Sequence, residues 1–200
     1  MNKVLSKEEI EAEGANLIDE IIRLSDFTFD RLPMLDIIGE RLVENLTAAF
    51  PDLTRVACEA SLVSLDYIPM GQVMEELPEP VLLAVGIGKP FEGEILLAID
   101  RALLLTSIEL MLGGSAANLN LEGVEGFTAI ELGFGERLAA AILAELQRAL
   151  SVVGSAALEL DRVEIDPDAA TVAKHNSLCA RLKYSIAMAG QTGVLDVVIP

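Results

Sequence analysis

The chain has 200 residues, of which 52% are hydrophobic and 4% aromatic, and it carries a formal net charge of −18. Nucleic acid and anionic lipid repel so acidic a chain, so we exclude both as direct partners. The length suits one domain or two small halves that share a core, and no apolar run is long enough to insert directly into a membrane as a helix.

Residues 1–27 are predicted to form an arm that precedes the folded core. The segment is rich in acidic residues and has few apolar ones at its start. It lacks the apolar stretch of a signal peptide, so we expect the chain to stay in the cytoplasm. Two interpretations stay open: a segment with helical tendency that folds against a partner, or a partly disordered leader without a role.

The first half of the core begins with a predicted helix and strand. Apolar residues recur at helical spacing from about Pro33 to Phe50, and a proline suits the first turn of a helix. Pro51 is expected to end this helix. Residues 55–67 then alternate as a strand with one polar face does, and Pro69 ends that strand.

A short helix and a hairpin complete the first half. Residues 71–77 indicate the short helix, and 81–88 form an apolar run typical of a buried strand. A turn at 89–93 leads to a returning strand at 94–100. A connecting helix is predicted over 101–112, with Asp100 as its cap and a loop at 115–127 after it.

The second half begins with another long helix. Thr128 and Glu131 have the spacing of a capping box, and the helix is expected to continue to about Leu150. It is apolar around most of its circumference, so we expect it to be largely buried. Residues 156–165 indicate a strand, and 168–174 can form a short helix.

The last segment predicts a hairpin. Residues 178–188 alternate between an apolar face and a polar face that holds Arg181, Lys183 and Ser185. A turn at 190–193 is followed by a final strand at 194–199.

The two halves repeat each other. The tetrad Gly39-Glu40-Arg41-Leu42 returns as Gly135-Glu136-Arg137-Leu138, and the order of elements recurs at an offset of roughly a hundred residues. We therefore predict an α/β (α+β) fold in which two repeats, at about 30–100 and 128–200, are related by a pseudo-twofold axis. Their hairpins are expected to merge into one sheet flanked by the long helices.

Side chains suited to chemistry are scarce. Cys58 and Cys179 fall far apart in strand-like runs, which favours two buried thiols. His175 is the only histidine, and neither a metal site nor a catalytic triad is built from one histidine without companions. Gly86 and Gly88 lie inside a strand without a phosphate-loop continuation. We predict no cofactor, no metal and no catalytic residues.

Several short motifs, in their order and spacing, resemble the middle domain of the FliM family, whose fold is shared with the CheC chemotaxis phosphatases. The resemblance spans about residues 25–200, and we place the domain at 28–200. The motifs are Asp26-Phe27, Arg31-Leu32, Leu35-Asp36-Ile37-Ile38, Glu40-Arg41, Leu77-Pro78-Glu79-Pro80, Leu96 to Asp100, Leu110-Met111-Leu112-Gly113-Gly114, Phe127-Thr128-Ala129-Ile130-Glu131 and Asn176.

The resemblance implies a non-enzymatic component of the flagellar motor switch that takes part in chemotactic control of rotation. It implies a location in the basal body, in the cytoplasmic ring at the inner membrane. The middle domain of the family binds FliG and packs side by side against neighbouring copies. A C-terminal domain related to FliN completes the ring. This chain stops at Pro200, where the middle domain would end, so we expect a fragment or a shortened relative.

The resemblance also implies a FliG contact at the family's Gly-Gly-x-Gly loop. Gly113, Gly114 and Ser115 fit this pattern, whereas Ala116 replaces the third glycine. Alanine restricts the positive φ angles and the close backbone approach that glycine permits. The alternative interpretation is that Gly113 and Gly114 only stop a helix.

In the arm, the resemblance implies a short helix that captures phosphorylated CheY. The residues that match its opening are Leu5, Ser6, Glu8, Glu9 and Ile10. The family's next two leucines are Glu13 and Gly14 here, so the apolar end of an amphipathic motif is missing. An altered or weak interaction with CheY is expected.

The alternative function is a CheC-type phosphatase acting on phosphorylated CheY. Those enzymes carry a glutamate and, three positions later, an asparagine on their long helices, where one helical turn puts both on one face. Here Val43 follows Glu40 and Ala139 follows Glu136 at that spacing. Glu13 and Asn16 have the spacing but lie in the arm. The long helices therefore favour a scaffold over an enzyme.

Overall fold

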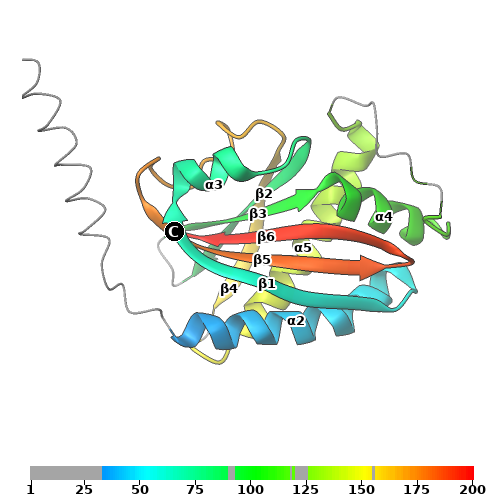
Figure 1. Cartoon of the computed structure of the whole chain (residues 1–200), viewed down its shortest axis with the longest axis horizontal. Coiled ribbons are helices and arrows are strands. Elements are labelled where there is room, and N and C mark those ends of the chain that lie inside the picture. The colour runs from blue at the N-terminus through cyan, green and yellow to red at the C-terminus, as the bar shows by residue number, and fades with distance from the viewer. Residues whose placement is uncertain (1–32, 90–92, 118, 120–125, 155) are drawn as a thin grey trace, which may run out of the picture. The chain divides into compact units, whose positions relative to one another are not determined.

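The computed structural model describes residues 33–89, 93–117, 119, 126–154 and 156–200, and residues 34–200 form one compact unit (Figure 1). The helices are α2 (Pro33–Thr54), α3 (Met70–Glu76), α4 (Arg101–Met111) and α5 (Ala129–Leu150). The strands are β1 (Cys58–Pro69), β2 (Val81–Lys89), β3 (Glu94–Asp100), β4 (Ala157–Glu164), β5 (Leu178–Met188) and β6 (Gln191–Ile199). The predicted arm, with its candidate CheY contacts, lies outside the described residues.

The strands form one antiparallel sheet with the order β1-β5-β6-β3-β2-β4. Each strand has a counterpart in the other repeat: β1 and β4, β2 and β5, β3 and β6. When every strand is exchanged for its counterpart, the result is the same order read from the opposite edge of the sheet. The sheet is therefore symmetric about the central β3–β6 pair. This arrangement confirms the predicted duplication and the merging of two hairpins into one sheet.

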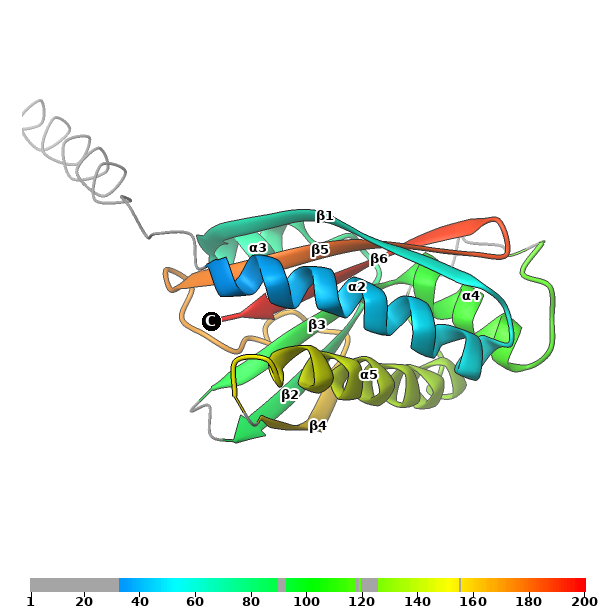
Figure 2. The same ribbon diagram turned by 90° about the horizontal axis from the view of Figure 1, so that it is seen from below.

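Both faces of the sheet are packed. On one face, α2 and α5 run antiparallel to each other (Figure 2) and form the larger core together with α4. On the other face, α3 and residues from the 166–177 segment form a smaller core. Alternate residues of β2 serve the two cores: Leu82 and Ala84 face the long helices, and Leu83 faces α3.

The local signals at the starts of α4 and α5 are confirmed. The Asp100 carboxylate accepts the N–H of Leu103 at 2.7 Å, and Thr128 and Glu131 form a reciprocal capping box. The expectation that α5 is largely buried is wrong for its outer face, where Gly133, Glu136 and other residues are exposed. No element of the described residues covers that face.

Pro51 does not end the first long helix, which continues to Thr54. A proline inside a helix forfeits one backbone hydrogen bond. Here it lies in the final turn, where the Thr54 hydroxyl donates to the Phe50 carbonyl at 2.9 Å. The helix stops where Arg55 adopts a left-handed φ of 59°.

Two expectations in the second repeat are also wrong. Residues 168–174 form no helix: 168–170 belong to a turn and 171–174 are irregular, because the Asp166 carboxylate accepts the N–H of Asp168 and starts a local turn. The last hairpin turns at Ala189 and Gly190, with φ of 50° and 78°, and β6 already begins at Gln191. Two successive positive φ angles are typical of the two-residue turns that suit the twist of a hairpin.

Candidate partner-binding loop

The loop after α4 begins with a regular helix stop. The N–H of Gly113 donates to the Leu110 carbonyl at 3.0 Å, and the N–H of Gly114 donates to the Glu109 carbonyl at 2.8 Å. This pair of bonds is the Schellman motif, which requires a left-handed residue, and Gly113 supplies it with a φ of 88°. The interpretation of Gly113 and Gly114 as a helix stop is therefore correct.

The same residues also present an exposed surface. Gly113, Gly114 and Ser115 are exposed, and the Leu112 side chain before them is 67% exposed. The Glu109 side chain covers one side of Gly114, since a Cβ added there would lie 2.2 Å from its Oε1 atom. The loop thus offers backbone groups, one apolar side chain and one carboxylate to a partner.

Ala116 closes the loop in a left-handed conformation. Its φ is 56°, and the residue is only 1% exposed, with its side chain in the larger core. Its carbonyl accepts a hydrogen bond from the side-chain amide of Gln191 at 3.2 Å. A left-handed alanine costs roughly 1–2 kcal/mol, which a glycine would avoid. The alanine therefore keeps the left-handed geometry at an energetic cost.

The structure does not bring the catalytic pattern of the phosphatases together. Glu40 and Glu136 are exposed on α2 and α5, and the positions one turn later hold Val43 and Ala139. The nearby Asn45 instead donates its side-chain amide to the Glu145 carbonyl at 3.1 Å, which ties α2 to α5. In the described parts of these helices, no asparagine is paired with a glutamate at the catalytic spacing.

A groove of about 360 Å³ lies between α2 and α5. Small residues such as Ala48 and Ala144 line it, and one end holds the ion pair between Glu145 and Arg148 at 2.5 Å. Its lining includes no histidine, cysteine, serine or threonine. The groove therefore lacks a hydroxyl or thiol nucleophile.

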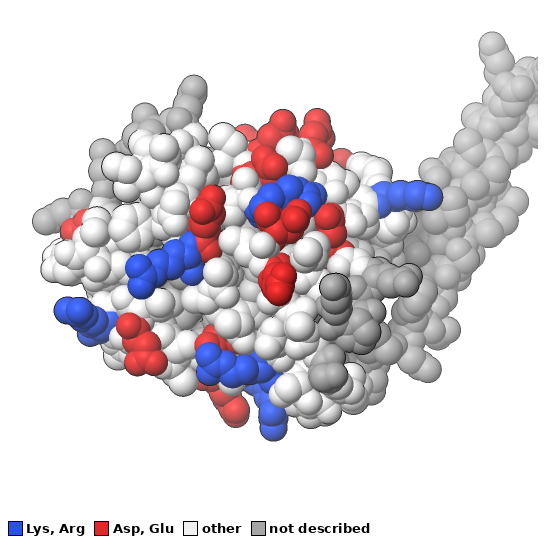
Figure 3. Space-filling model, turned by 180° about the vertical axis from the view of Figure 1, so that it is seen from behind, with Lys and Arg blue, Asp and Glu red and all other residues white. Residues whose placement is uncertain are grey.

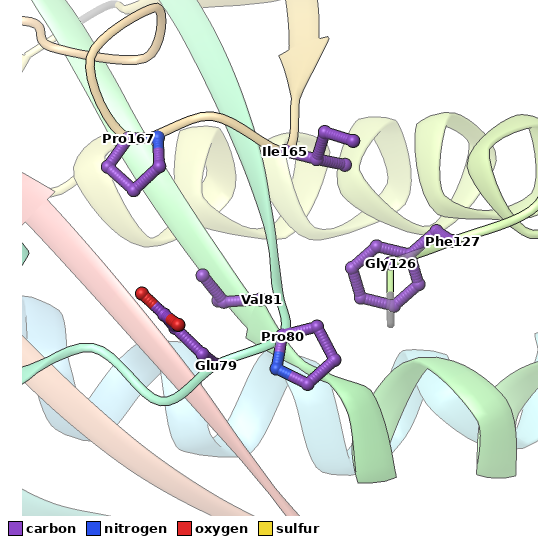
Figure 4. A pocket seen from close by; sticks show the side chains of 7 residues that line it. All are labelled: Glu79, Pro80, Val81, Gly126, Phe127, Ile165 and Pro167. Atoms are coloured by element: carbon purple, nitrogen blue, oxygen red, sulfur yellow. The ribbon is translucent and has the colours of Figure 1, made fainter. Parts of the chain in front are cut away.

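A second concavity, of about 480 Å³, lies at one end of β2 (Figure 4). Its lining is mainly apolar, with Glu79 as the one ionisable group: Glu79, Pro80, Val81, Gly126, Phe127, Ile165 and Pro167. The Arg101 guanidinium lies over the Phe127 ring at 5.5 Å and donates to the Gly126 carbonyl. The Glu79 side chain is exposed, and no second titratable side chain lines this concavity.

The other side chains considered for chemistry are the two cysteines and the histidine. Cys58 and Cys179 are free and buried, as predicted, and burial raises the pKa of the Cys58 thiol to about 11. His175 is exposed, and its ring lies against the backbone of Gly71. Among the described residues, no group of three or more histidine, cysteine or acidic side chains is placed to hold a metal ion.

On the face shown in Figure 3, acidic side chains gather around a basic one at the upper centre, and other charged side chains are scattered among uncharged ones. No helix in the described part of the chain is both long and apolar enough to cross a membrane.

Sequence reasoning missed Gln191, which lies 75 residues from its partner Ala116. No local pattern marks such a bond, because it depends on how β6 is placed beside the loop.

Comparison with known proteins identifies the family. The model of the family "Flagellar motor switch protein FliM" matches residues 28–200. The FliM of Caulobacter vibrioides (strain NA1000 / CB15N) is 29% identical over 185 residues, which are 92% of this chain and 49% of that protein. The FliM of Bacillus subtilis (strain 168) is 22% identical, over 98% of this chain and 58% of that protein. The chain thus spans about half the length of these relatives.

Solved structures share the fold. A FliG–FliM complex from H. pylori contains a chain with a TM-score of 0.80 and 21% identity, over 87% of this chain and 94% of that chain. The chemotaxis protein CheX from Vibrio vulnificus is a more distant match, with a TM-score of 0.52 and 11% identity, over 82% of this chain and 99% of that chain. The CheC-like fold is therefore confirmed, and by its match over residues 28–200 the chain belongs to the FliM family of flagellar motor switch proteins.

Proposed function

We propose that this chain is a non-enzymatic scaffold of the flagellar motor switch that binds FliG through the loop at 113–116. The observation that carries the proposal is the match of the FliM family model to residues 28–200. The preformed loop after α4 supports it, because a loop already held in one conformation loses little entropy on binding. The H. pylori structure, a FliG–FliM complex, supports FliG as the partner.

The surface around the loop fits a protein partner. Leu112 supplies an exposed apolar side chain, and Gly113 and Gly114 supply exposed backbone. A few well-packed side chains near the centre of an interface contribute most of its binding energy when the contacts around them exclude water. We assign the contact to Gly113, Gly114, Ser115 and Ala116, with Ala116 acting from below the surface.

Further partners follow from the same proposal. Neighbouring copies pack side by side in the cytoplasmic ring, FliN-type proteins complete that ring, and the ring lies at the cytoplasmic face of the inner membrane in the basal body. Phosphorylated CheY meets the arm through Leu5, Ser6, Glu8, Glu9 and Ile10. The changes at Glu13 and Gly14 weaken that interaction.

The proposal is tested by measuring association of the purified chain with FliG, beside a standard FliM. Gly114→Leu should weaken association strongly, since the new side chain starts 2.2 Å from Glu109 Oε1 and projects from the contact surface. Gly133→Leu is the matched control, because Gly133 is exposed on α5 with nothing within 4 Å of an added Cβ. If the chain shows no association where the standard FliM associates, the proposal fails.

The second candidate is a CheC-type phosphatase, which the shared fold favours. It predicts faster release of phosphate from phosphorylated CheY in the presence of the chain. We expect no acceleration, because Val43 and Ala139 replace the asparagine that would orient the attacking water. A clear acceleration that is lost in a Glu40→Gln, Glu136→Gln double variant would support the phosphatase instead.

A further inference from the structure

We propose that Gln191 is a positioning residue that holds the loop at 113–116 in its binding conformation. The proposal rests on the assignment of this loop as the FliG contact. Gln191 is the first residue of β6 and belongs to the second repeat, whereas the loop follows α4 in the segment that connects the two repeats. Its side-chain amide donates to the Ala116 carbonyl at 3.2 Å and so ties the second repeat to the connecting loop at the proposed contact surface.

Gln191 itself is held in place. It pairs with Met188 across the hairpin, and the two-residue turn at Ala189 and Gly190 fixes the register of this pair. Two residues further along β6, Gly193 lies so close to α4 that an added Cβ would be 2.5 Å from the Leu103 nitrogen. The start of β6 is therefore packed against the first turn of α4, and the loop emerges from the other end of that helix.

The loop is consequently held at both ends, at its start by the end of α4 and at its end by the start of β6. The Schellman bonds of Gly113 and Gly114 fix its start, and the bond from Gln191 fixes its end at Ala116. The end needs this support more than the start, because Ala116 adopts a left-handed φ that alanine disfavours. Without the Gln191 donor, the Ala116 carbonyl would lose this hydrogen bond, and the Ala116 backbone could relax from its left-handed conformation.

The third glycine of the family's Gly-Gly-x-Gly pattern is Ala116 here, and Gln191 accounts for how the chain tolerates it. A glycine would adopt the left-handed conformation at no steric cost. In this chain the side chain of Ala116 packs into the core while Gln191 holds its carbonyl. With alanine in place of the third glycine, the backbone at position 116 has less conformational freedom, and the loop is held in one conformation.

The test replaces Gln191 with methionine, which keeps the length of the side chain and removes the donor. We expect Gln191→Met to weaken association with FliG about tenfold, as loss of one useful hydrogen bond predicts. Amide hydrogen exchange at 113–117 should become faster in the free chain, while exchange within β5 and β6 stays as in the original chain. The control is Gln72→Met, which deletes the exposed bond from Gln72 to Glu76 on α3 and should change neither measurement.

Two outcomes overturn the proposal. One is Gln191→Met binding FliG as tightly as the original chain does. The other is unchanged amide exchange in the loop, which is measured without FliG and so tests the role of Gln191 even if FliG does not bind. Absence of binding by the original chain would instead refute the proposed function, and the exchange rates alone would then decide whether Gln191 holds the loop.

Discussion

The Arg181 Nε and Asp196 Oδ1 atoms lie 2.7 Å apart in the middle of the sheet, and their side chains are 4% and 1% exposed. The two residues are diagonal neighbours on β5 and β6, since Arg181 pairs with Val198 and Lys183 pairs with Asp196. Glu76 of α3 accepts a second bond from Arg181 at 2.7 Å. The sequence pattern predicted a polar face here, and α3 covers this face at Arg181, so that the arginine forms a buried ion pair.

Removing one partner of this pair should be costly. Asp196→Ala leaves the Arg181 guanidinium buried without its carboxylate, and breaking a buried ion pair costs about 3–5 kcal/mol. Urea unfolding measures the loss. Glu76→Gln is the control, because the Glu76 side chain is 47% exposed and water screens its interaction with Arg181, so its loss should be much smaller. Equal losses in the two variants would contradict this account of the sheet.

The glycine in the second copy of the repeated tetrad should not tolerate a methyl group. A Cβ on Gly135 would lie 2.3 Å from Cδ1 of Leu82, a fully buried residue of β2. Overpacking of this kind costs about 1–3 kcal/mol, which exceeds the gain of about 1 kcal/mol from alanine in a helix. We expect Gly135→Ala to lower the midpoint of thermal unfolding.

Gly133→Ala provides the opposite case on the same helix. Nothing lies within 4 Å of its added Cβ, so only the helix propensity remains and the variant should be more stable by about 0.5–1 kcal/mol. If both variants moved stability in the same direction, close packing of α5 on β2 would not explain the repeated glycine.

These residues also show what the sequence could predict. The caps at Asp100 and Thr128 and the repeated order of elements were predictable, because each depends on neighbours in sequence or on a pattern that occurs twice. The burial of Arg181 and the role of Gln191 were not, since both depend on partners that only the fold brings together. The candidate loop was located by its resemblance to the family's motif. The left-handed φ of Ala116 could not be predicted from the sequence, since alanine disfavours that conformation.

The two thiols should be inert in the folded chain. Burial raises the pKa of Cys58 from 9.0 to about 11 and also raises that of Cys179, so little thiolate forms at pH 8. A thiol reagent such as an aromatic disulfide should therefore react slowly with the native chain and rapidly after unfolding in urea. Fast reaction of either cysteine at pH 8, without unfolding, would show that its strand is accessible.

The cap of α4 should show a measurable pH dependence. Burial raises the pKa of the Asp100 carboxyl, although the N–H of Leu103 and that of Val194 oppose the shift. A carboxyl whose folded pKa is raised binds more protons in the folded state than in the unfolded state. Its contribution to the free energy of unfolding therefore falls as pH rises from the ordinary carboxyl range to the raised value, and is constant above it.

Asp100→Asn separates the cap from the charge. Asparagine keeps an oxygen that accepts the Leu103 N–H but does not ionise, so the variant should gain stability relative to the original chain as pH rises through that range. Asp100→Ala removes the acceptor as well and should cost about 1 kcal/mol at neutral pH. Urea unfolding at several pH values measures both, with Asp52→Asn on the exposed side of α2 as the matched control. A stability difference between Asp100→Asn and the original chain that does not change with pH would show that burial does not disfavour the charge on this cap.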